Sequence, residues 1–207
     1  MSRSLDYSSI NPKIPIILAS GSKSRKQMLD EAGIIFEIKV SSTDEESIKN
    51  EIASLPFSDQ VIHLAKVKAV SISKENPNAI VIGGDQMCAL GDRLLNKPGS
   101  KERAIESLKI LSNQKHHQHS GVCIYRNNEC IWEYSETVEL QMHNLSEAEI
   151  INYVEMENPI HAAGAYKFES LGCNLFSFVD GSSYTVRGMP LIPLLNALRE
   201  LDIIDLE

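Results

Sequence analysis

The sequence has no long apolar run and no low-complexity segment. Its 207 residues contain no apolar stretch near the ~20 residues that a membrane-spanning helix needs. The polar start, residues 1–15, lacks the apolar core of a signal peptide. The eleven glycines and eight prolines are too scattered to form a linker or a repeat. We therefore expect a cytoplasmic globular protein without a membrane partner.

Cysteine and positive charge are also scarce. The formal net charge is −8, so no overall basic field attracts nucleic acid, and a polyanion must bind at a local cluster of cations, with a metal ion. The cysteines have no C-x-x-C spacing, and we expect buried, reduced thiols rather than disulfides or a zinc site. They are Cys88, Cys123, Cys130 and Cys173.

Apolar runs and helical patterns alternate in the first half of the chain. Residues 14–20 and 78–90 are apolar runs typical of strands buried on both faces, and Gly83-Gly84-Asp85 interrupts the second run. A strand is also predicted over residues 34–40, followed by an acidic loop over residues 41–51. Helical spacing and capping residues predict helices in five places: residues 23–32, 58–75, 100–111 and 146–156, and the segment after Pro190.

The second half of the chain changes pattern. Residues 116–142 alternate between apolar and polar side chains and contain the turn signal Asn127-Asn128, which predicts an antiparallel hairpin. Ser146 and Glu149 have the spacing of a capping box at the start of a helix. Alternating elements followed by a hairpin indicate a mixed α/β fold with a groove. No linker divides the chain, so we expect one domain over residues 1–207.

Residues 17–29, ILASGSKSRKQML, join a buried strand to a helix through small residues from Ser20 to Ser22. Backbone N–H groups at the positive end of a helix bind anions, and small residues let a phosphate come close. Arg25 and Lys26 would add charge-assisted hydrogen bonds. A helix capped by Ser22, with solvated cations, explains the same residues equally well. The segment lacks the G-x-x-x-x-G-K-[ST] pattern of a P-loop.

Asp85 follows two glycines at the predicted end of a strand. Ligands of α/β sheets bind beyond the carboxyl ends of the strands, where a carboxylate can hold a divalent metal or accept a proton from water. A free aspartate is a weak base, so both roles stay open. The alternative is an aspartate that caps the N–H groups of a turn.

Other charged and imidazole side chains are weaker signals when taken alone. Lys97 stands before a proline that fixes the chain beside it, and Glu45 could join the aspartate at a metal. Glu45 equally fits a solvated run of charges. His117 and His119 would share one face of a strand and His116 the other. No third ligand is evident, so we interpret them as strand histidines without a metal role.

Taken together and in order, seven segments resemble the Maf family of nucleoside triphosphate pyrophosphatases. The resemblance covers residues 14–201, which leaves residues 1–13 as an N-terminal extension. Each motif is weak alone, and the ordered set is specific. The segments are LASGSKSRKQML, Asp44-Glu45, LAKVKA (64–69), GGDQ, NKP, YVEMENPIHAAGAYKFES (153–170) and VRGMPL (186–191).

The resemblance implies a single Maf-like domain with a mixed α/β fold, similar to inosine triphosphatase. Its sheet would be elongated, twisted and flanked by helices, with a nucleotide cleft. The implied reaction is hydrolysis of a nucleoside triphosphate (NTP) to a monophosphate (NMP) and diphosphate with Mg²⁺ or Mn²⁺, which would clear modified or surplus nucleotides. The family is often dimeric, so the implied partners are a nucleotide and a second copy of the chain.

The resemblance also implies roles for individual residues. Asp85 falls at the position of the family's proton acceptor, and Glu45 and Asp85 are the implied metal ligands. The implied phosphate-binding side chains are Ser20, Ser22, Arg25, Lys68, Lys97 and Lys167.

Three residues fall at positions linked to the choice of base: Ser24, Gln86 and Glu169. Gln86 and Glu169 are similar to the branch that acts on 7-methyl-GTP, and a carboxylate at residue 169 suits the donor edge of guanine. That branch typically has tryptophan where this chain has Ser24, so a stacking platform is missing.

Two other functions compete with this hypothesis. Relatives in the Maf family are also described as septum formation inhibitors, and a nucleotide-binding regulator of cell division would keep the same side chains. A sugar-phosphate nucleotidyltransferase also combines a Gly-rich loop with an arginine and a Lys-Pro pair. In those enzymes Lys-Pro follows the loop closely, whereas here Lys97 lies 72 residues beyond Arg25.

Overall fold

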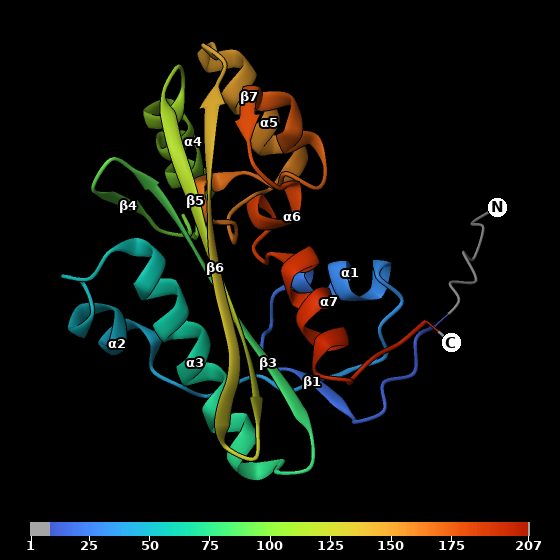
Figure 1. Ribbon diagram of the computed structural model, residues 1–207. Helices are drawn as coiled ribbons and strands as arrows, with labels where there is room; N and C mark the ends of the chain where they lie inside the picture. Colours follow the sequence, from blue (N-terminus) through green and yellow to red (C-terminus); the bar gives the residue numbers. More distant parts are fainter. Residues whose placement is uncertain (1–8, 207) are drawn as a thin grey trace.

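The computed structural model describes residues 9–206, which form a mixed sheet covered by helices (Figure 1). The strands are β1 (Ile16–Leu18), β2 (Glu37–Ile38), β3 (Ile80–Leu90), β4 (Arg93–Leu95), β5 (Lys115–Arg126), β6 (Glu129–Met142) and β7 (Phe176–Asp180). Their order is β2-β1-β3-β5-β6-β7, with β4 paired to β3. β1 is parallel to β2 and β3, and the remaining pairs are antiparallel.

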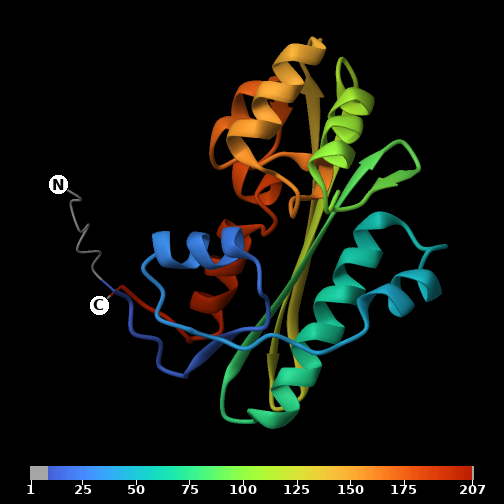
Figure 2. The same ribbon diagram turned by 180° about the vertical axis from the view of Figure 1, so that it is seen from behind.

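The helices cover both faces of this sheet. They are α1 (Lys23–Glu31), α2 (Glu45–Glu51), α3 (Phe57–Glu75), α4 (Lys101–Leu111), α5 (Glu147–Glu157), α6 (Ser183–Val186) and α7 (Leu191–Glu200), with short 3-10 turns at Ala163–Ala165 and Leu171–Leu175. Figures 1 and 2 show α3 on one side of the central strands and α1 and α7 on the other. The mixed α/β class with helices flanking the sheet is confirmed.

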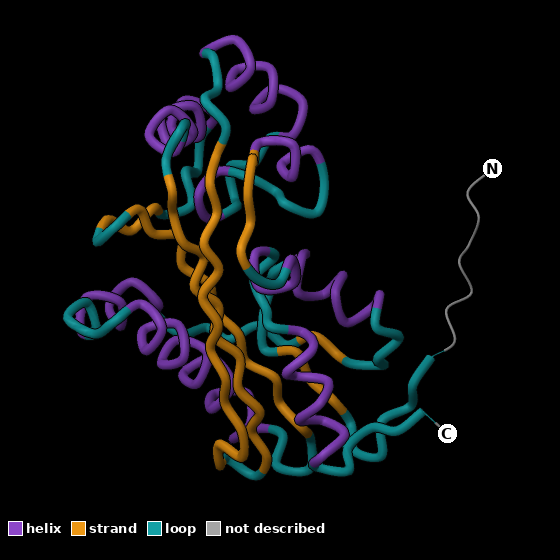
Figure 3. The backbone as a smooth tube through the Cα atoms, turned by 45° about the horizontal axis from the view of Figure 1, so that its top comes forward, coloured by secondary structure: helices purple, strands orange, loops and turns teal. Residues whose placement is uncertain are grey.

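The long strands β5 and β6 connect two ends of the molecule, as the tube in Figure 3 shows. At one end α1, α3 and α7 cover β1, β3 and β5. At the other end α4, α5 and α6 surround the far parts of β3, β5 and β6. The predicted hairpin is therefore the element that joins both ends, and its turn residues Asn127 and Asn128 both have positive φ.

The core at the first end alternates along β1 and β3. Ile16 and Leu18 face the layer of α1 and α7, whereas Ile17 faces α3. Ile82 and Val81 on β3 divide in the same way. Burial on both faces, as predicted for these two strands, follows from helices on both sides.

Glycines bring α3 into close contact with the sheet. A Cβ atom on Gly83 would lie 2.2 Å from the Ala65 carbonyl oxygen, and one on Gly121 would lie 2.8 Å from the Val61 carbonyl carbon. Both distances are too short for a real side chain. Gly83 and Gly121 therefore allow the helix backbone to rest directly on β3 and β5.

Several predicted boundaries are wrong. β3 runs without interruption through Gly83-Gly84-Asp85, because the antiparallel ladder to β5 pairs all three residues. The expected acidic loop contains α2, since the Asp44 carboxylate caps Glu46 N–H and Ser47 N–H. The strand expected over residues 34–40 is reduced to the two residues of β2.

The cysteine prediction is correct for two residues and wrong for two. Cys88 and Cys123 are buried, and burial raises the pKa of the Cys88 thiol to about 12. Cys130 and Cys173 are exposed. Cys130 lies in the first part of β6, where most side chains are exposed. Among residues 9–206, no helix has both the length and the apolar character to cross a bilayer. Most of the predicted extension, residues 1–8, lies outside the described residues.

Candidate functional site

The N-terminus of α1 forms the first part of the candidate site. The Ser22 hydroxyl caps the helix by accepting a hydrogen bond from Arg25 N–H at 3.3 Å. The Arg25 guanidinium is only 7% exposed, and it donates from Nε to the Gly188 carbonyl oxygen (2.7 Å) and from Nη1 to Ser20 Oγ (3.0 Å). These bonds orient Arg25 and leave further N–H donors for an anion.

Burial is the main influence on the charge of Arg25. It lowers the pKa of the guanidinium, whereas the carboxylates of Asp85 and Glu45 act in the opposite direction. A buried guanidinium normally has a carboxylate in direct contact. Here the carboxylates act through space, so the cation is available to a ligand with negative charge.

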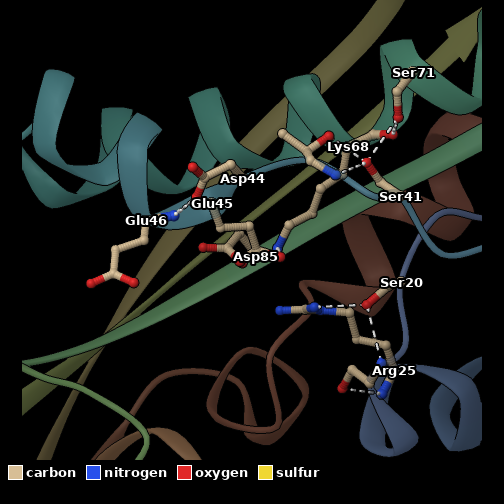
Figure 4. A network of polar contacts seen from close by, with 11 residues as sticks. Ser20, Arg25, Ser41, Asp44, Glu45, Glu46, Lys68, Ser71 and Asp85 are labelled. Carbon is tan, nitrogen blue, oxygen red and sulfur yellow. Dashed lines mark hydrogen bonds and ion pairs between the residues drawn. The ribbon is translucent and has the colours of Figure 1, made fainter.

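Asp85 and Lys68 form the second part of the site. Lys68 extends from α3, where its position on the apolar face of the helix brings it over the sheet, and its Nζ lies 2.6 Å from Asp85 Oδ1. The two residues are 8% and 6% exposed. Lys68 Nζ also lies 3.0 Å from Glu45 Oε1 at the start of α2. Figure 4 shows Lys68 between these carboxylates, with Arg25 and Ser20 below β3.

The second oxygen of Asp85 is unusual. Asp85 Oδ2 is buried and has no hydrogen-bond partner within the described structure. A buried carboxylate oxygen without a partner is costly, because it has lost water and gained nothing in return. This atom can therefore accept a proton or bind a metal ion.

Lys97 completes the group of charges. It lies in the loop between β4 and α4 and is exposed. Partial loss of water around the ammonium lowers the pKa of Lys97, and the nearby cation of Arg25 lowers it further, whereas Asp85 raises it. Lys97, Arg25 and Asp85 thus share one electrostatic environment, and the segments around Ser22 and Asp85 meet in space.

A cavity of about 1220 Å³ opens beside this group. Its walls come from α2, the first turns of α3 and the segment from β3 to α4. Glu45, Gln86 and Lys97 connect it to the charged side chains described above. Further lining residues combine apolar and cationic groups: Lys49, Leu55, Phe57, Gln60, Leu94 and Arg103. This is the groove that the mixed α/β pattern predicts.

Gln86 and Ser24 lie on the opposite side of β3 from Lys68. Gln86 Nε2 donates to the Val186 carbonyl oxygen at 2.7 Å, and Ser24 Oγ donates to the Arg187 carbonyl oxygen at 2.9 Å. Successive residues of a strand point to opposite faces, so Asp85 meets α3 and Gln86 meets the end of α6. Ser24 and Gln86 are both half-buried.

Two predicted site residues do not join this group by any contact within residues 9–206. The Lys167 ammonium donates to the Glu157 carbonyl oxygen at 2.6 Å and lies 3.4 Å from Glu157 Oε1, at the end of α5. Glu169, two residues further on, is exposed. Both residues lie after α5, between the 3-10 turns Ala163–Ala165 and Leu171–Leu175.

The three histidines interact with neighbours on the sheet. His116 is fully buried with its Nε2 3.0 Å from the Tyr166 hydroxyl, and burial lowers its pKa to about 4. His119 Nδ1 lies 2.9 Å from Thr137 Oγ1, and burial lowers the pKa of this imidazole to about 4 as well. His117 lies near Glu139. Each histidine thus has a partner on the sheet or packed against it.

Glu45 and Asp85 are suited to hold a divalent metal. In the described part of the chain, no three acidic, histidine or cysteine side chains converge as a ready ligand set. Mg²⁺ is commonly bound by only one or two carboxylates together with substrate phosphates and water. The unpartnered Asp85 Oδ2 and the half-buried Glu45 carboxylate provide that smaller set of hard oxygen ligands.

The sequence alone did not predict a role for the end of α6 and the loop that follows it. There, Val186, Arg187 and Gly188 supply carbonyl oxygens to Gln86, Ser24 and Arg25. The VRGMPL motif did contain a signal, namely Gly188, which has φ +109° in the structure. A glycine before Met-Pro indicates a backbone conformation that other residues adopt with difficulty.

The chain is similar to known proteins over most of its length. The sequence model of one family, described as Maf-like protein, matches residues 15–201. A nucleoside triphosphate pyrophosphatase of Legionella pneumophila (strain Corby) is 40% identical over 190 residues, 92% of this chain and 95% of the relative. A 7-methyl-GTP pyrophosphatase of Rhizobium meliloti (strain 1021) is 34% identical over 194 residues, 92% of this chain and 98% of the relative.

Among solved structures, a HAM1 protein from Coxiella burnetii is 17% identical with a TM-score of 0.41, over 64% of this chain and 74% of that one. The family match spans most of the chain, and the relatives match over nearly their whole length. This chain belongs to the Maf family.

Proposed function

We propose that this chain is a nucleoside triphosphate pyrophosphatase, which hydrolyses an NTP to an NMP and diphosphate with a divalent metal ion. The observation that carries the proposal is the Lys68 ammonium between Asp85 and Glu45, on the strand face opposite a buried Arg25. A triphosphate carries about four negative charges, and these cations surround the place where it would lie. The Legionella and Rhizobium relatives, which have this activity in their names, support the proposal.

In the proposed reaction, a water oxygen attacks the α-phosphorus of the nucleotide. The bond from the α-phosphorus to the oxygen shared with the β-phosphorus breaks, and diphosphate leaves with that oxygen. Asp85 Oδ1 is held by Lys68, so Oδ2 is the atom that orients the water and accepts its proton. The hydrogen bond from Lys68 fixes the Asp85 carboxylate in position for this step.

The cations bind the triphosphate and stabilise its charge. The backbone N–H groups at the start of α1, with Ser20 and Ser22 beside them, suit one phosphate group. Arg25 and Lys97 stabilise the charge that develops on the leaving diphosphate. Glu45 and Asp85 would hold Mg²⁺ or Mn²⁺, which supplies further positive charge to the phosphate oxygens.

The base preference is the finer part of the proposal. We propose 7-methyl-GTP as one substrate, because Gln86 and Glu169 fit that branch of the family and a relative carries that name. Glu169 is exposed in the segment after α5, so its carboxylate is accessible to the donor edge of a guanine. The variant Glu169→Gln is expected to change the relative rates for different bases and to leave the fold intact. An unchanged base profile would remove Glu169 from the base site.

A substrate panel tests the proposed activity. The chain is incubated with canonical NTPs and 7-methyl-GTP, with Mg²⁺, with Mn²⁺ or with a chelator, and diphosphate release is measured. We expect diphosphate and NMP in equal amounts, and none in the chelator. Tight binding of nucleotides without turnover of any of them would favour the regulator of cell division. A nucleotide-sugar product from NTP and sugar phosphate would favour the nucleotidyltransferase.

A further inference from the structure

The last two residues of α6 and the first two of the loop that follows present four consecutive carbonyl oxygens to side chains of the site. We call residues 185–188 the carbonyl segment. The donors come from β5, β3 and α1, so this short stretch of backbone connects three elements. The four pairs, donor first, are Ser120 to Thr185 (2.8 Å), Gln86 to Val186 (2.7 Å), Ser24 to Arg187 (2.9 Å) and Arg25 to Gly188 (2.7 Å).

These contacts determine which atoms of Gln86 remain for a ligand. Its amide nitrogen donates to the Val186 carbonyl oxygen and, at 3.4 Å, to the Thr185 carbonyl oxygen. An amide has two N–H donors and one oxygen that only accepts. With the nitrogen directed at the carbonyl segment, Oε1 is the atom of Gln86 that remains for a ligand, and Gln86 is one of the residues that line the cavity.

The same segment leaves room for Gln86 Oε1 and orients Arg25, the residue proposed to bind phosphate. A Cβ atom on Gly188 would lie 3.0 Å from Gln86 Oε1 and 3.6 Å from Arg25 Nη2. Glycine suits this position for two reasons: it has no Cβ to crowd Gln86, and it readily adopts the φ of +109° found here. Arg25 and Gln86 touch adjacent parts of one backbone, so a shift of the segment moves both.

An ion pair fastens the carbonyl segment to α1. Arg187 Nη1 and Nη2 both lie 3.0 Å from Glu31 Oε2 at the end of α1. The Arg187 side chain is 11% exposed, which gives this pair a more fixed geometry than a surface ion pair. The hydrogen bond from Arg187 is also the main cause that lowers the pKa of Glu31. The segment is thus fixed at its centre to the helix that carries Ser24 and Arg25.

We propose that the carbonyl segment, held by Arg187 and Glu31, is a positioning element for two side chains. It orients Arg25 toward the triphosphate, and it leaves Gln86 with only its acceptor oxygen, Oε1, for the nucleobase. The site then favours bases that present an N–H donor to Gln86. This inference rests on the proposed function, because it assigns the base side of the same site. Arg187 acts through the backbone that it holds and does not itself touch the nucleotide.

Two pairs of nucleotides that differ by one amino group test this preference. GTP has an amino group at C2 that ITP lacks, and ATP has one at C6 that purine riboside triphosphate lacks. We measure kcat and KM for the wild-type chain and for Arg187→Ala, Arg187→Lys and Glu31→Gln. Lys109→Ala is the matched control, because it removes an ion pair between α4 and α5 at the other end of the sheet.

The wild-type chain is expected to favour the amino-bearing member of at least one pair by about tenfold in kcat/KM, the effect of one hydrogen bond. Arg187→Ala should bring that ratio close to one and raise KM for every nucleotide. Arg187→Lys should give an intermediate ratio, since one of two N–H contacts is kept. Glu31→Gln should behave like Arg187→Lys, and Lys109→Ala should leave the ratio unchanged.

Three results would overturn the inference. These are equal rates within both pairs, an Arg187→Ala variant that loses thermal stability but keeps the wild-type ratio, and a change in ratio from Lys109→Ala as large as that from Arg187→Ala. The same nucleotides are also titrated into Asp85→Asn and Asp85→Asn/Arg187→Ala chains. These Kd ratios test the inference even if the wild-type chain releases no diphosphate, which would refute the proposed function alone.

Discussion

The two faces of β3 carry different kinds of polar interaction. On the face toward α3, Asp85 and Lys68 form a buried ion pair at 2.6 Å. On the other face, Gln86 meets neutral backbone carbonyl oxygens, and Gly84 makes room for Arg25, whose Nε would lie 3.2 Å from a Cβ at that position. In the proposed mechanism, the alternation of the strand therefore separates proton transfer on one face from recognition on the other.

This separation has a physical advantage for a site that binds a polyanion. Buried charges change the ionisation of their neighbours, and a neutral amide on the same face as Asp85 would compete for Lys68. In the proposed mechanism, nucleobase recognition and proton transfer take place on opposite faces. The contact with the nucleobase can therefore change without disturbing the proton acceptor Asp85. The comparison predicts that variants of Asp85 and Lys68 on the α3 face alter the rate for every nucleotide alike, and that variants of Gln86 on the other face alter the preference among bases.

The variant Asp85→Asn should have the largest effect on activity. Loss of the proton acceptor is expected to lower kcat by two to four orders of magnitude, by about the same factor for every nucleotide. Nucleotide binding should persist, because Arg25 and Lys97 are unchanged. Kinetics on the substrate panel and a binding titration measure both quantities. A variant that keeps wild-type turnover would show that Asp85 has another role.

Arg25→Ala should follow with an effect of about a hundredfold on kcat/KM, again for every nucleotide, because Arg25 contacts phosphate rather than base. Arg25→Lys keeps the charge and should recover part of the loss. Lys23→Ala is the control on the exposed side of the same helical turn. Damage limited to one base would contradict the assignment of Arg25 to the triphosphate.

Alanine substitutions of the adjacent glycines Gly83 and Gly84 should change the free energy of unfolding by different amounts, because the two residues lie on opposite faces of β3. Gly83→Ala places a methyl group 2.2 Å from the Ala65 carbonyl oxygen, so we expect about 1–3 kcal/mol of lost stability. Gly84→Ala should lose less stability but raise KM, since the displaced group is the Arg25 side chain. Denaturant unfolding and steady-state kinetics measure these effects. Equal losses of stability in both variants would show that the faces are packed alike.

The pH dependence should show the smallest effect. The pKa of Lys97 is lowered, so in the free enzyme its ammonium loses its proton at a lower pH than the ordinary value of 10.5. Below this pKa the cation is present, and kcat/KM should fall as pH rises through it. Lys97→Arg should move this alkaline decline to higher pH. A decline at the same pH in both proteins would assign it to another group.

Local signals explain which parts of the molecule could be predicted from the sequence. Ser22 caps α1 as expected, and Ser146 and Glu149 form the predicted capping box at α5. The Asn127-Asn128 turn sets the hairpin. Each depends on residues within a few positions, where side-chain chemistry and backbone conformation are directly coupled.

The features that were missed depend on contacts between distant residues. The bond from Arg25 to Gly188 joins positions 163 apart in the chain, and the ion pair of Arg187 with Glu31 joins positions 156 apart. The role of Gly83 was not predicted either, since the glycine pair indicated the end of a strand rather than a continuous strand packed against α3. The Maf resemblance supplied Lys68 as a site residue, but its place between two carboxylates required the structure.

A crystal structure of the full chain with Mn²⁺ and an NTP analogue whose α,β-bridging oxygen is a methylene group tests the central claim most directly. We predict the α-phosphate beside Asp85 Oδ2, the metal on Glu45 and Asp85, and the base on the Gln86 side of β3. A nucleotide bound with its phosphates away from both Asp85 and Arg25 would contradict the division of functions between the two faces.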